Sequence, residues 1–345
     1  MSISEQADPT PEQQIEDAFS KWDQQAVSTK SRCQRWDLLQ TIFPPLAALL
    51  LSIQVVSFPH GSPVSKALIF IELAVLFIAL LMALRRADIA GVCWVPYRLK
   101  AEVLRREQYL LEARVGAYLN CGSTAEISAA VHARLSILNS EEDNPRDFVP
   151  LTDPVNEPWR HQLEDLRLRA REGYPADEEF MSMLPELFES YYHDRVLGQK
   201  SWYQNRTHKH AATDNVVGTL GSITLVAALV FAAIHLTTMY FGAPGSTDGG
   251  WIVIAAIALP PISAAFSEVR ALMQGRQLSR SYAQYEQDIA RIETRFAELM
   301  GDIQCGEDHQ PSEALAFRFK RLVLEAEELF AAEMRTWYVL MAPAD

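Results

Sequence analysis

Two groups of basic residues have the type and spacing that could bind an anionic ligand. The first consists of Arg160, Arg167, Arg169 and Arg171. The second consists of Arg318, Lys320 and Arg321. Helical spacing places Arg160, Arg167 and Arg171 on one face with Arg169 adjacent, and a guanidinium group can hold a phosphate with two parallel hydrogen bonds. Glutamates are interspersed with both groups, so a solvated charged face is the competing interpretation.

No catalytic or metal-binding motif accompanies these basic groups. The sequence contains no Walker loop, GxGxxG, HExxH or GxSxG pattern, and its cysteines and histidines lack the spacing of a metal site. We therefore expect a protein that is not an enzyme and that needs no cofactor or metal.

A few residues inside apolar segments could line or gate an ion path. An uncompensated carboxylate within a membrane costs about 2 to 3 kcal/mol, so Glu72 either belongs to a ring around a cation-conducting pore or is a carboxylate near the loop that holds Lys66. His235 is either a titratable pore group or a partner in a helix-to-helix hydrogen bond. Pro260 and Pro261 would bend their helix, either as a gate or as a static distortion.

Four apolar segments must position these residues, and they occur as two close pairs. They are Ile42–Phe58, Ala67–Leu84, Val216–Phe241 and Trp251–Ser267. A membrane-spanning helix needs about 20 apolar residues, range roughly 17 to 25. We therefore expect an all-α membrane protein with four transmembrane helices, arranged as two hairpins with long cytoplasmic helical extensions.

The distribution of charge predicts the orientation of these hairpins. Basic residues gather at their outer ends, whereas the hairpin loops hold only Lys66. By the positive-inside rule, both termini and the long middle segment lie in the cytoplasm, so we expect a multi-pass protein of the inner (plasma) membrane. The net charge of −13 then belongs to the cytoplasmic part, which argues against a nonspecific binder of nucleic acid or anionic lipid.

Helical patterns fill the rest of the chain and suggest five segments. These are an N-terminal helical segment (1–39), the first hairpin with a stalk helix (40–120), a helical connector (121–190), the second hairpin with a stalk helix (191–300) and a C-terminal amphipathic helix (301–345). We expect the first stalk to run from Arg85 to about Tyr118 with a kink at Pro96. The apolar stripe of Ser312–Met341 should pack on the stalks or on a neighbouring subunit.

The two halves of the chain resemble each other. A basic lead-in with a tryptophan, RCQRW and then QKSWYQNRTHKH, precedes each hairpin, and a helix rich in Tyr, Arg and Glu follows it. The offset is about 180 residues, which is typical of a duplicated unit. The two hairpins should therefore pack pseudo-symmetrically.

The helix after the first hairpin carries a motif that resembles a known family. Its residues are Trp94, Tyr97, Arg98, Ala101, Glu102, Leu104, Arg105, Glu107 and Tyr109. This pattern, W-x-x-Y-R-x-x-A-E-x-L-R-x-E-x-Y, resembles the SLATT proteins (SMODS- and SLOG-associating two-transmembrane effectors). Trp202 and Tyr203 are similar to the lead-in of that family, and the resemblance covers the larger part of the chain.

The resemblance implies a pore-forming membrane effector of anti-phage defence. Such effectors are encoded with a nucleotidyltransferase that makes cyclic or linear oligonucleotide signals. Here the hairpin is duplicated and the sequence contains no SLOG domain, so the helical body or a partner would have to sense the nucleotide.

Two interpretations of the motif residues remain open. Arg98 and Glu102 form an i,i+4 pair, which is worth a few tenths of a kcal/mol when exposed. The motif is either a packing and salt-bridge seam or a signal-transmission element that includes Trp94, Tyr97 and Arg105. We expect a homo-oligomeric ring, such as a tetramer, that opens or closes on binding a nucleotide. The alternative is a non-conducting membrane scaffold that docks a cytoplasmic protein through the C-terminal stripe.

Overall fold

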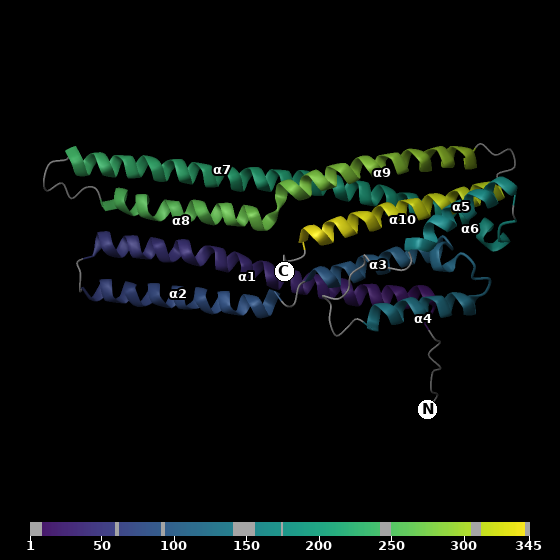
Figure 1. The fold of residues 1–345 in the computed structure, drawn as a ribbon, viewed down its shortest axis with the longest axis horizontal. Helices are drawn as coiled ribbons and strands as arrows, with labels where there is room; N and C mark the ends of the chain where they lie inside the picture. The colour runs from purple at the N-terminus through teal and green to yellow at the C-terminus, as the bar shows by residue number, and fades with distance from the viewer. Residues whose placement is uncertain are drawn as a thin grey trace, which may run out of the picture. The chain divides into compact units, whose positions relative to one another are not determined.

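The computed structural model describes residues 9–58, 62–90, 94–140, 156–173, 175–241, 250–304 and 312–341, and all regular structure in these ranges is helical (Figure 1). The elements are α1 Pro11–Ser57, α2 Pro63–Ala90, α3 Trp94–Glu112, the short 3-10 helix η1 Gly116–Tyr118, α4 Thr124–Ser140, α5 Asn156–Glu172, α6 Glu178–Ser190, the π-helical turn η3 Tyr191–Leu197, α7 Gly198–Phe241, α8 Gly250–Met273, α9 Gly275–Gln304 and α10 Glu313–Met341. The predicted all-α class is confirmed for this part of the chain.

The chain forms two compact units, each assembled from segments far apart in the sequence. The body unit comprises Met1–Lys30, Cys93–Asn205 and Tyr282–Asp345, and the apolar unit comprises Ser31–Val92 and Arg206–Ser281. Three long helices, α1, α7 and α9, each contribute residues to both units. The division into five successive segments stays a prediction.

The body unit is built around α10. This helix contacts α3, α5 and α6, and its residues Phe319, Leu322 and Phe330 are buried. Phe188 of α6 lies 5.7 Å from Phe319 and 5.6 Å from Phe296 of α9 between ring centroids. The C-terminal stripe therefore packs on the first stalk helix, as predicted, because a continuous apolar face must be removed from water.

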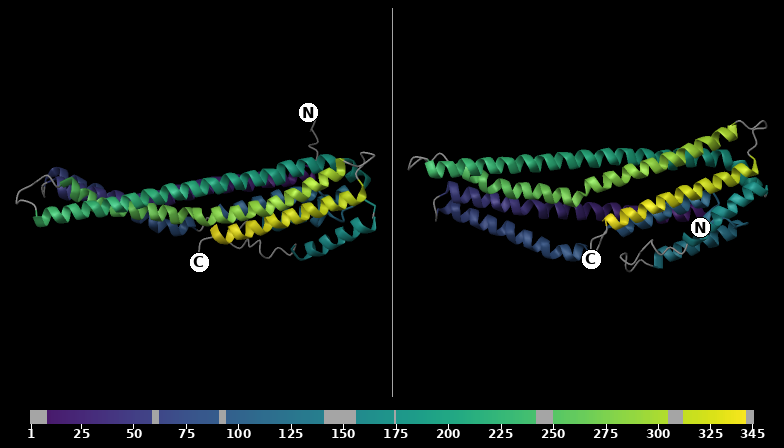
Figure 2. Two further views of the ribbon diagram at one scale, coloured as in Figure 1. Left: turned by 90° about the horizontal axis from the view of Figure 1, so that it is seen from above. Right: turned by 45° about the horizontal axis from the view of Figure 1, so that its top comes forward.

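Two pairs of helices make up the apolar unit, as Figure 2 also shows. Helices α7 and α8 run antiparallel, and the Ser263 hydroxyl donates a hydrogen bond of 2.9 Å to the Gly221 carbonyl. A Cβ atom at Gly221 would lie 3.2 Å from the Cβ of Phe266, so glycine allows the close approach. Helices α1 and α2 lie side by side, with Gln54 Nε2 3.5 Å from Ser65 Oγ.

In the part of the chain that the structure describes, three helical runs are long and apolar enough to cross a membrane. They are Pro11–Gln54, Glu178–Thr238 and Gly250–Ile303, and they contain most of three of the predicted spans. The fourth, Ala67–Leu84, lies in α2 and extends beyond the residues whose side chains the structure describes. The arrangement of four spans in two hairpins therefore stays a prediction.

The first stalk is not the single helix expected from Arg85 to Tyr118. Helix α2 ends at Ala90, and α3 begins at Trp94 and ends at Glu112. Pro96 consequently lies in the first turn of α3, where a missing N–H breaks no helical hydrogen bond, rather than at a kink. Arg114 and Gly116 then adopt φ values of 49° and 67°, which turn the chain out of the helix.

Candidate functional site

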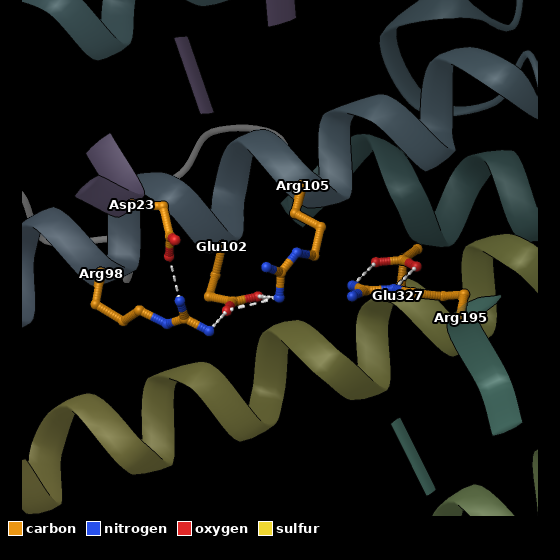
Figure 3. Close-up of polar contacts among 6 residues, drawn as sticks. All are labelled: Asp23, Arg98, Glu102, Arg105, Arg195 and Glu327. Carbon is orange, nitrogen blue, oxygen red and sulfur yellow. Dashed lines mark hydrogen bonds and ion pairs between the residues drawn. The ribbon is translucent and has the colours of Figure 1, made fainter. Parts of the chain in front are cut away.

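The predicted signal-transmission residues form a chain of charges between α1 and α3 (Figure 3). Arg98 Nη1 lies 2.5 Å from Asp23 Oδ1, and the other arm of Arg98 forms an ion pair with Glu102. Arg105 Nη1 donates to both oxygens of Glu102, at 3.1 and 3.2 Å. The i,i+4 spacing places Arg98 beside Glu102, whereas Asp23 is a partner from another helix. The seam of salt bridges is therefore present, and a transmission role stays a prediction.

Aromatic contacts hold the first turn of α3, just before these charges. Trp94 packs edge to face on Trp337 of α10, with 5.3 Å between ring centroids, and the Lys30 ammonium lies 4.3 Å from the Trp94 ring. Tyr97 stacks on Trp22 of α1 at 5.9 Å. Rigid aromatic pairs of this kind hold α1, α3 and α10 in register.

The Trp22–Tyr97 contact has a counterpart in the second half of the chain. Trp202 on α7 packs edge to face on Tyr282 of α9, with 5.4 Å between centroids. In each half, a tryptophan before the apolar segments meets a tyrosine after them. Trp22 thus makes the same kind of contact as Trp202, whereas the lead-in RCQRW, which ends at Trp36, stays a prediction. We call the two contacts the Trp–Tyr braces.

A buried ion pair joins the π-helical turn η3 to α10. Arg195 binds Glu327 through two parallel hydrogen bonds of 2.8 Å, and both side chains are nearly inaccessible, at 3% and 0% exposure (Figure 3). The Tyr191 hydroxyl also donates to Glu327, at 3.0 Å. Burial opposes the charged form of Arg195, but Glu327 outweighs it and raises the pKa of the guanidinium group. This pair was not predicted, although Glu327 interrupts the apolar stripe of α10 and could have signalled a buried partner.

Near this pair, Glu333 of α10 accepts a hydrogen bond from Tyr203 of α7. Burial is the main cause that raises the pKa of Glu333, the Tyr203 hydrogen bond lowers it and the negative charge of Glu102 raises it, and together with smaller effects they bring the pKa to about 7. Burial likewise raises the pKa of Tyr203. Glu333 is therefore a carboxyl group that changes charge near neutral pH.

In the apolar unit, one carboxylate binds residues on both sides of a break between α8 and α9. Arg270 donates two hydrogen bonds to Asp214, at 2.8 and 2.7 Å, and Arg276 donates a third, at 2.9 Å. The bonds from Arg270 lower the pKa of Asp214 to about 2, against the effect of its burial. We call Asp214, Arg270 and Arg276 the Asp214 clamp.

The break itself lies at Gln274, which adopts a φ of 45°. A Cβ atom on the next residue, Gly275, would lie 3.1 Å from both the Asp214 Cβ and the His210 carbonyl oxygen of α7. The fourth apolar segment was expected to run into its stalk helix with little interruption. The left-handed turn instead separates α8 from α9, and the clamp spans it. Asp214 lies just before the third apolar segment and Arg270 just after the fourth. In an antiparallel hairpin these two positions lie at the same end, so the sequence could have suggested their contact.

The predicted pore and gate residues lie in the apolar unit. Glu72 in α2 and His235 in α7 are both half-buried. Pro260 is exposed and Pro261 half-buried, and α8 continues through both as a helix. A role for these residues in a pore or gate stays a prediction.

Most of the predicted ligand-binding arginines have a carboxylate partner. Arg167 lies 3.8 Å from Glu164, Arg169 2.9 Å from Asp165, Arg318 2.7 Å from Asp302, and Arg321 2.8 Å from Glu325. Arg171 is exposed at the end of α5, and the side chain of Arg160 lies outside the described residues. An anion would have to compete with these carboxylates. Among the described residues, no group of three His, Cys, Asp or Glu side chains could hold a metal ion.

Comparison with known proteins identifies one domain. Residues 191–337 match the family model of SLATT_1, the SMODS and SLOG-associating 2TM effector domain 1. The predicted family is confirmed, but over less than half of the 345 residues. The match contains Trp202, Tyr203, the Asp214 clamp and the Arg195–Glu327 pair, whereas the motif from Trp94 to Tyr109 lies outside it. No curated protein and no solved structure matches the chain.

Proposed function

Residues 191–337 form a SLATT effector domain, and from this premise we propose that the protein is a ligand-controlled membrane pore of bacterial anti-phage defence. The signal is a cyclic or linear oligonucleotide from a partner nucleotidyltransferase. It binds the helical body and shifts the balance between closed and open arrangements of the membrane spans.

The proposed topology has four spans in two hairpins, with both termini in the cytoplasm. It is supported by the pairing of α1 with α2 and of α7 with α8, and by the large apolar side chains that these helices expose. Phe70 of α2 is 73% exposed and Leu229 of α7 is 64% exposed. Such surfaces suit the hydrocarbon of a bilayer and not water.

The observation that carries the proposal is the course of α7. This one helix begins in the body unit, where Trp202 and Tyr203 pack, and ends in the apolar unit beyond Asp214. Along its length, α7 carries in succession Trp202 of the second Trp–Tyr brace, Tyr203, which binds Glu333, and Asp214 of the clamp. A change in the body can therefore reach the apolar segment along continuous helical backbone.

A pore requires several copies of the chain. The spans of one subunit carry few polar side chains and cannot enclose a hydrated path, so the subunits form a closed homo-oligomeric ring. Glu72 lines this ring and favours cations. His235, Pro260 and Pro261 are proposed to shape the path.

The scaffold alternative has less support. It required the C-terminal stripe as a docking surface, but Phe319, Leu322 and Phe330 are buried within the body unit. A partner could reach them only by displacing α10 from α3 and α5.

The pore is tested by ion flux in proteoliposomes made from the purified full-length protein. We expect potassium efflux that exceeds chloride efflux, and we expect Glu72→Gln to reduce this preference. Glu172→Gln, which removes an exposed carboxylate at the end of α5, serves as the matched control and should leave the preference unchanged. Flux that is absent with and without cyclic or linear dinucleotides would sink the proposal.

A further inference from the structure

Lys320 of α10 is a buried lysine whose charge lacks a bound carboxylate. The residue is 8% exposed, and its ammonium group lies 4.1 Å from the centroid of the Phe180 ring of α6. Among the described residues, no hydrogen bond or ion pair of Lys320 accompanies this ring contact. Lysines are rarely buried without a partner, because the loss of hydration is costly.

The charged groups around Lys320 leave its positive charge uncompensated. Arg114, which follows α3, and Arg169 of α5 both repel the ammonium group, and Asp177 attracts it. The carboxylate of Asp177 already binds other groups, because it forms an ion pair with Arg114 and caps the N-terminus of α6. Arg114 also binds Glu179 at 2.9 Å, and Arg169 binds Asp165 at 2.9 Å. Burial, followed by Arg114, lowers the pKa of Lys320 to about 8.

Arg114 and Lys320 both meet the first turn of α6, Arg114 through Asp177 and Glu179 and Lys320 through the Phe180 ring, and Arg169 of α5 adds a third positive charge. Arg114, Arg169 and Lys320 come from the end of α3, from α5 and from α10, while α6 supplies the aromatic wall. Their chemistry fits a compact anion with several oxygens, because an ammonium group binds one oxygen as a point charge and guanidinium groups bind others in parallel. Among the members of the two basic groups whose side chains the structure describes, Lys320 is the buried one without a carboxylate partner, whereas Arg171 is exposed.

We propose that Lys320, together with Arg114 and Arg169, forms a binding site for a phosphate group. The inference does not depend on the pore, since a chain that conducts no ions can still bind phosphate. The phosphate oxygens occupy the free coordination sites of the ammonium group and compete with Asp177 and Asp165 for the two arginines.

Isothermal titration calorimetry of the full-length protein in detergent tests the site, with inorganic phosphate as ligand at constant ionic strength. We expect Lys320→Met, which keeps the apolar stem, to weaken binding by at least about tenfold. Arg291→Met is the matched control, because Arg291 of α9 is an exposed arginine that pairs with Asp288; it should bind phosphate as the wild type does. Absence of phosphate binding by the wild type, or equal binding by Lys320→Met, would overturn the proposal.

A second measurement uses the wild type alone and so does not depend on the folding of a variant. Limited acetylation followed by mass spectrometry should show that phosphate protects Lys320 but not the exposed Lys209. At a reagent concentration that acetylates Lys320 in the phosphate-free protein, equal acetylation in the presence of phosphate would contradict the site. Repeating both measurements with adenosine monophosphate and a linear dinucleotide distinguishes a nucleotide phosphate from free phosphate. Binding tighter than that of inorganic phosphate assigns the site to a nucleotide, and equal binding assigns it to free phosphate.

Discussion

At the scale of single residues, we expect mutations to be most damaging at the buried Arg195–Glu327 pair. Both charged groups are buried, and the free-energy cost of removing them from water is offset by the two hydrogen bonds between them. The pair adds little net stability compared with apolar residues of the same shape. It is nevertheless costly to break, because the remaining partner would stay charged without a counter-ion.

Replacing one member of the pair should therefore destabilise the body unit more than replacing both. We expect Arg195→Met to cost about 3 to 5 kcal/mol, and the double variant Arg195→Met/Glu327→Met to recover much of that loss. Thermal unfolding in detergent, followed by circular dichroism, measures both. A double variant that is less stable than Arg195→Met would contradict this account of the pair.

Glu333 predicts a pH dependence with a definite sign. Its pKa is raised from 4.5 to about 7, so the folded protein binds a proton that the unfolded chain has released between these values. Stability therefore falls as the pH rises through this window and levels off above it. Glu333→Gln mimics the protonated form and should remove this contribution.

The measurement is the melting temperature of the wild type and of Glu333→Gln between about pH 5 and about pH 8. We expect the variant to be the more stable protein at the alkaline end, with the difference shrinking toward the acidic end. A difference that does not change with pH would show that Glu333 does not titrate in this range.

At the scale of helices, the Asp214 clamp sets how α8 is joined to α9. The pKa of Asp214 is lowered from 3.8 to about 2, so the clamp is lost only as the pH falls through that window and stays charged at neutral pH. It binds one residue before the break and one after it. The clamp therefore restrains the turn at Gln274 without a continuous helix.

Asp214→Asn should loosen this turn. We expect amide hydrogen exchange over residues 270–281 to become at least about tenfold faster, because two guanidinium groups lose their shared carboxylate. Asp302→Asn, which breaks the exposed pair with Arg318, is the control and should leave this segment unchanged. Unaltered exchange in Asp214→Asn would mean that packing around Gly275, and not the clamp, holds the turn.

The helices themselves were predictable because apolar residues recur at helical spacing along Ser312–Met341 and fill the long apolar segments. The ends of the helices were harder to predict. The break at Gln274 carries no glycine or proline at the left-handed residue, and Pro96 fits the first turn of a helix as well as a kink. Asp23 and Trp22 could not be matched to Arg98 and Tyr97 from spacing, because these contacts join separate helices and depend on the packing of the body unit.

At the scale of the whole molecule, the repeated Trp–Tyr braces extend the resemblance between the two halves beyond the matched SLATT domain. The brace of the first half, Trp22–Tyr97, lies outside residues 191–337, and the brace of the second half, Trp202–Tyr282, lies inside them. This repetition supports a duplicated unit in which each half contributes one hairpin to the proposed pore.

The most direct test of the central claim is the current through a planar bilayer that contains the purified full-length protein. We predict discrete conductance steps whose open probability changes when a cyclic or linear dinucleotide is added on the side of the termini, and not when it is added on the opposite side. A bilayer that stays electrically silent with and without these nucleotides, although the protein is shown to be inserted, would contradict the account.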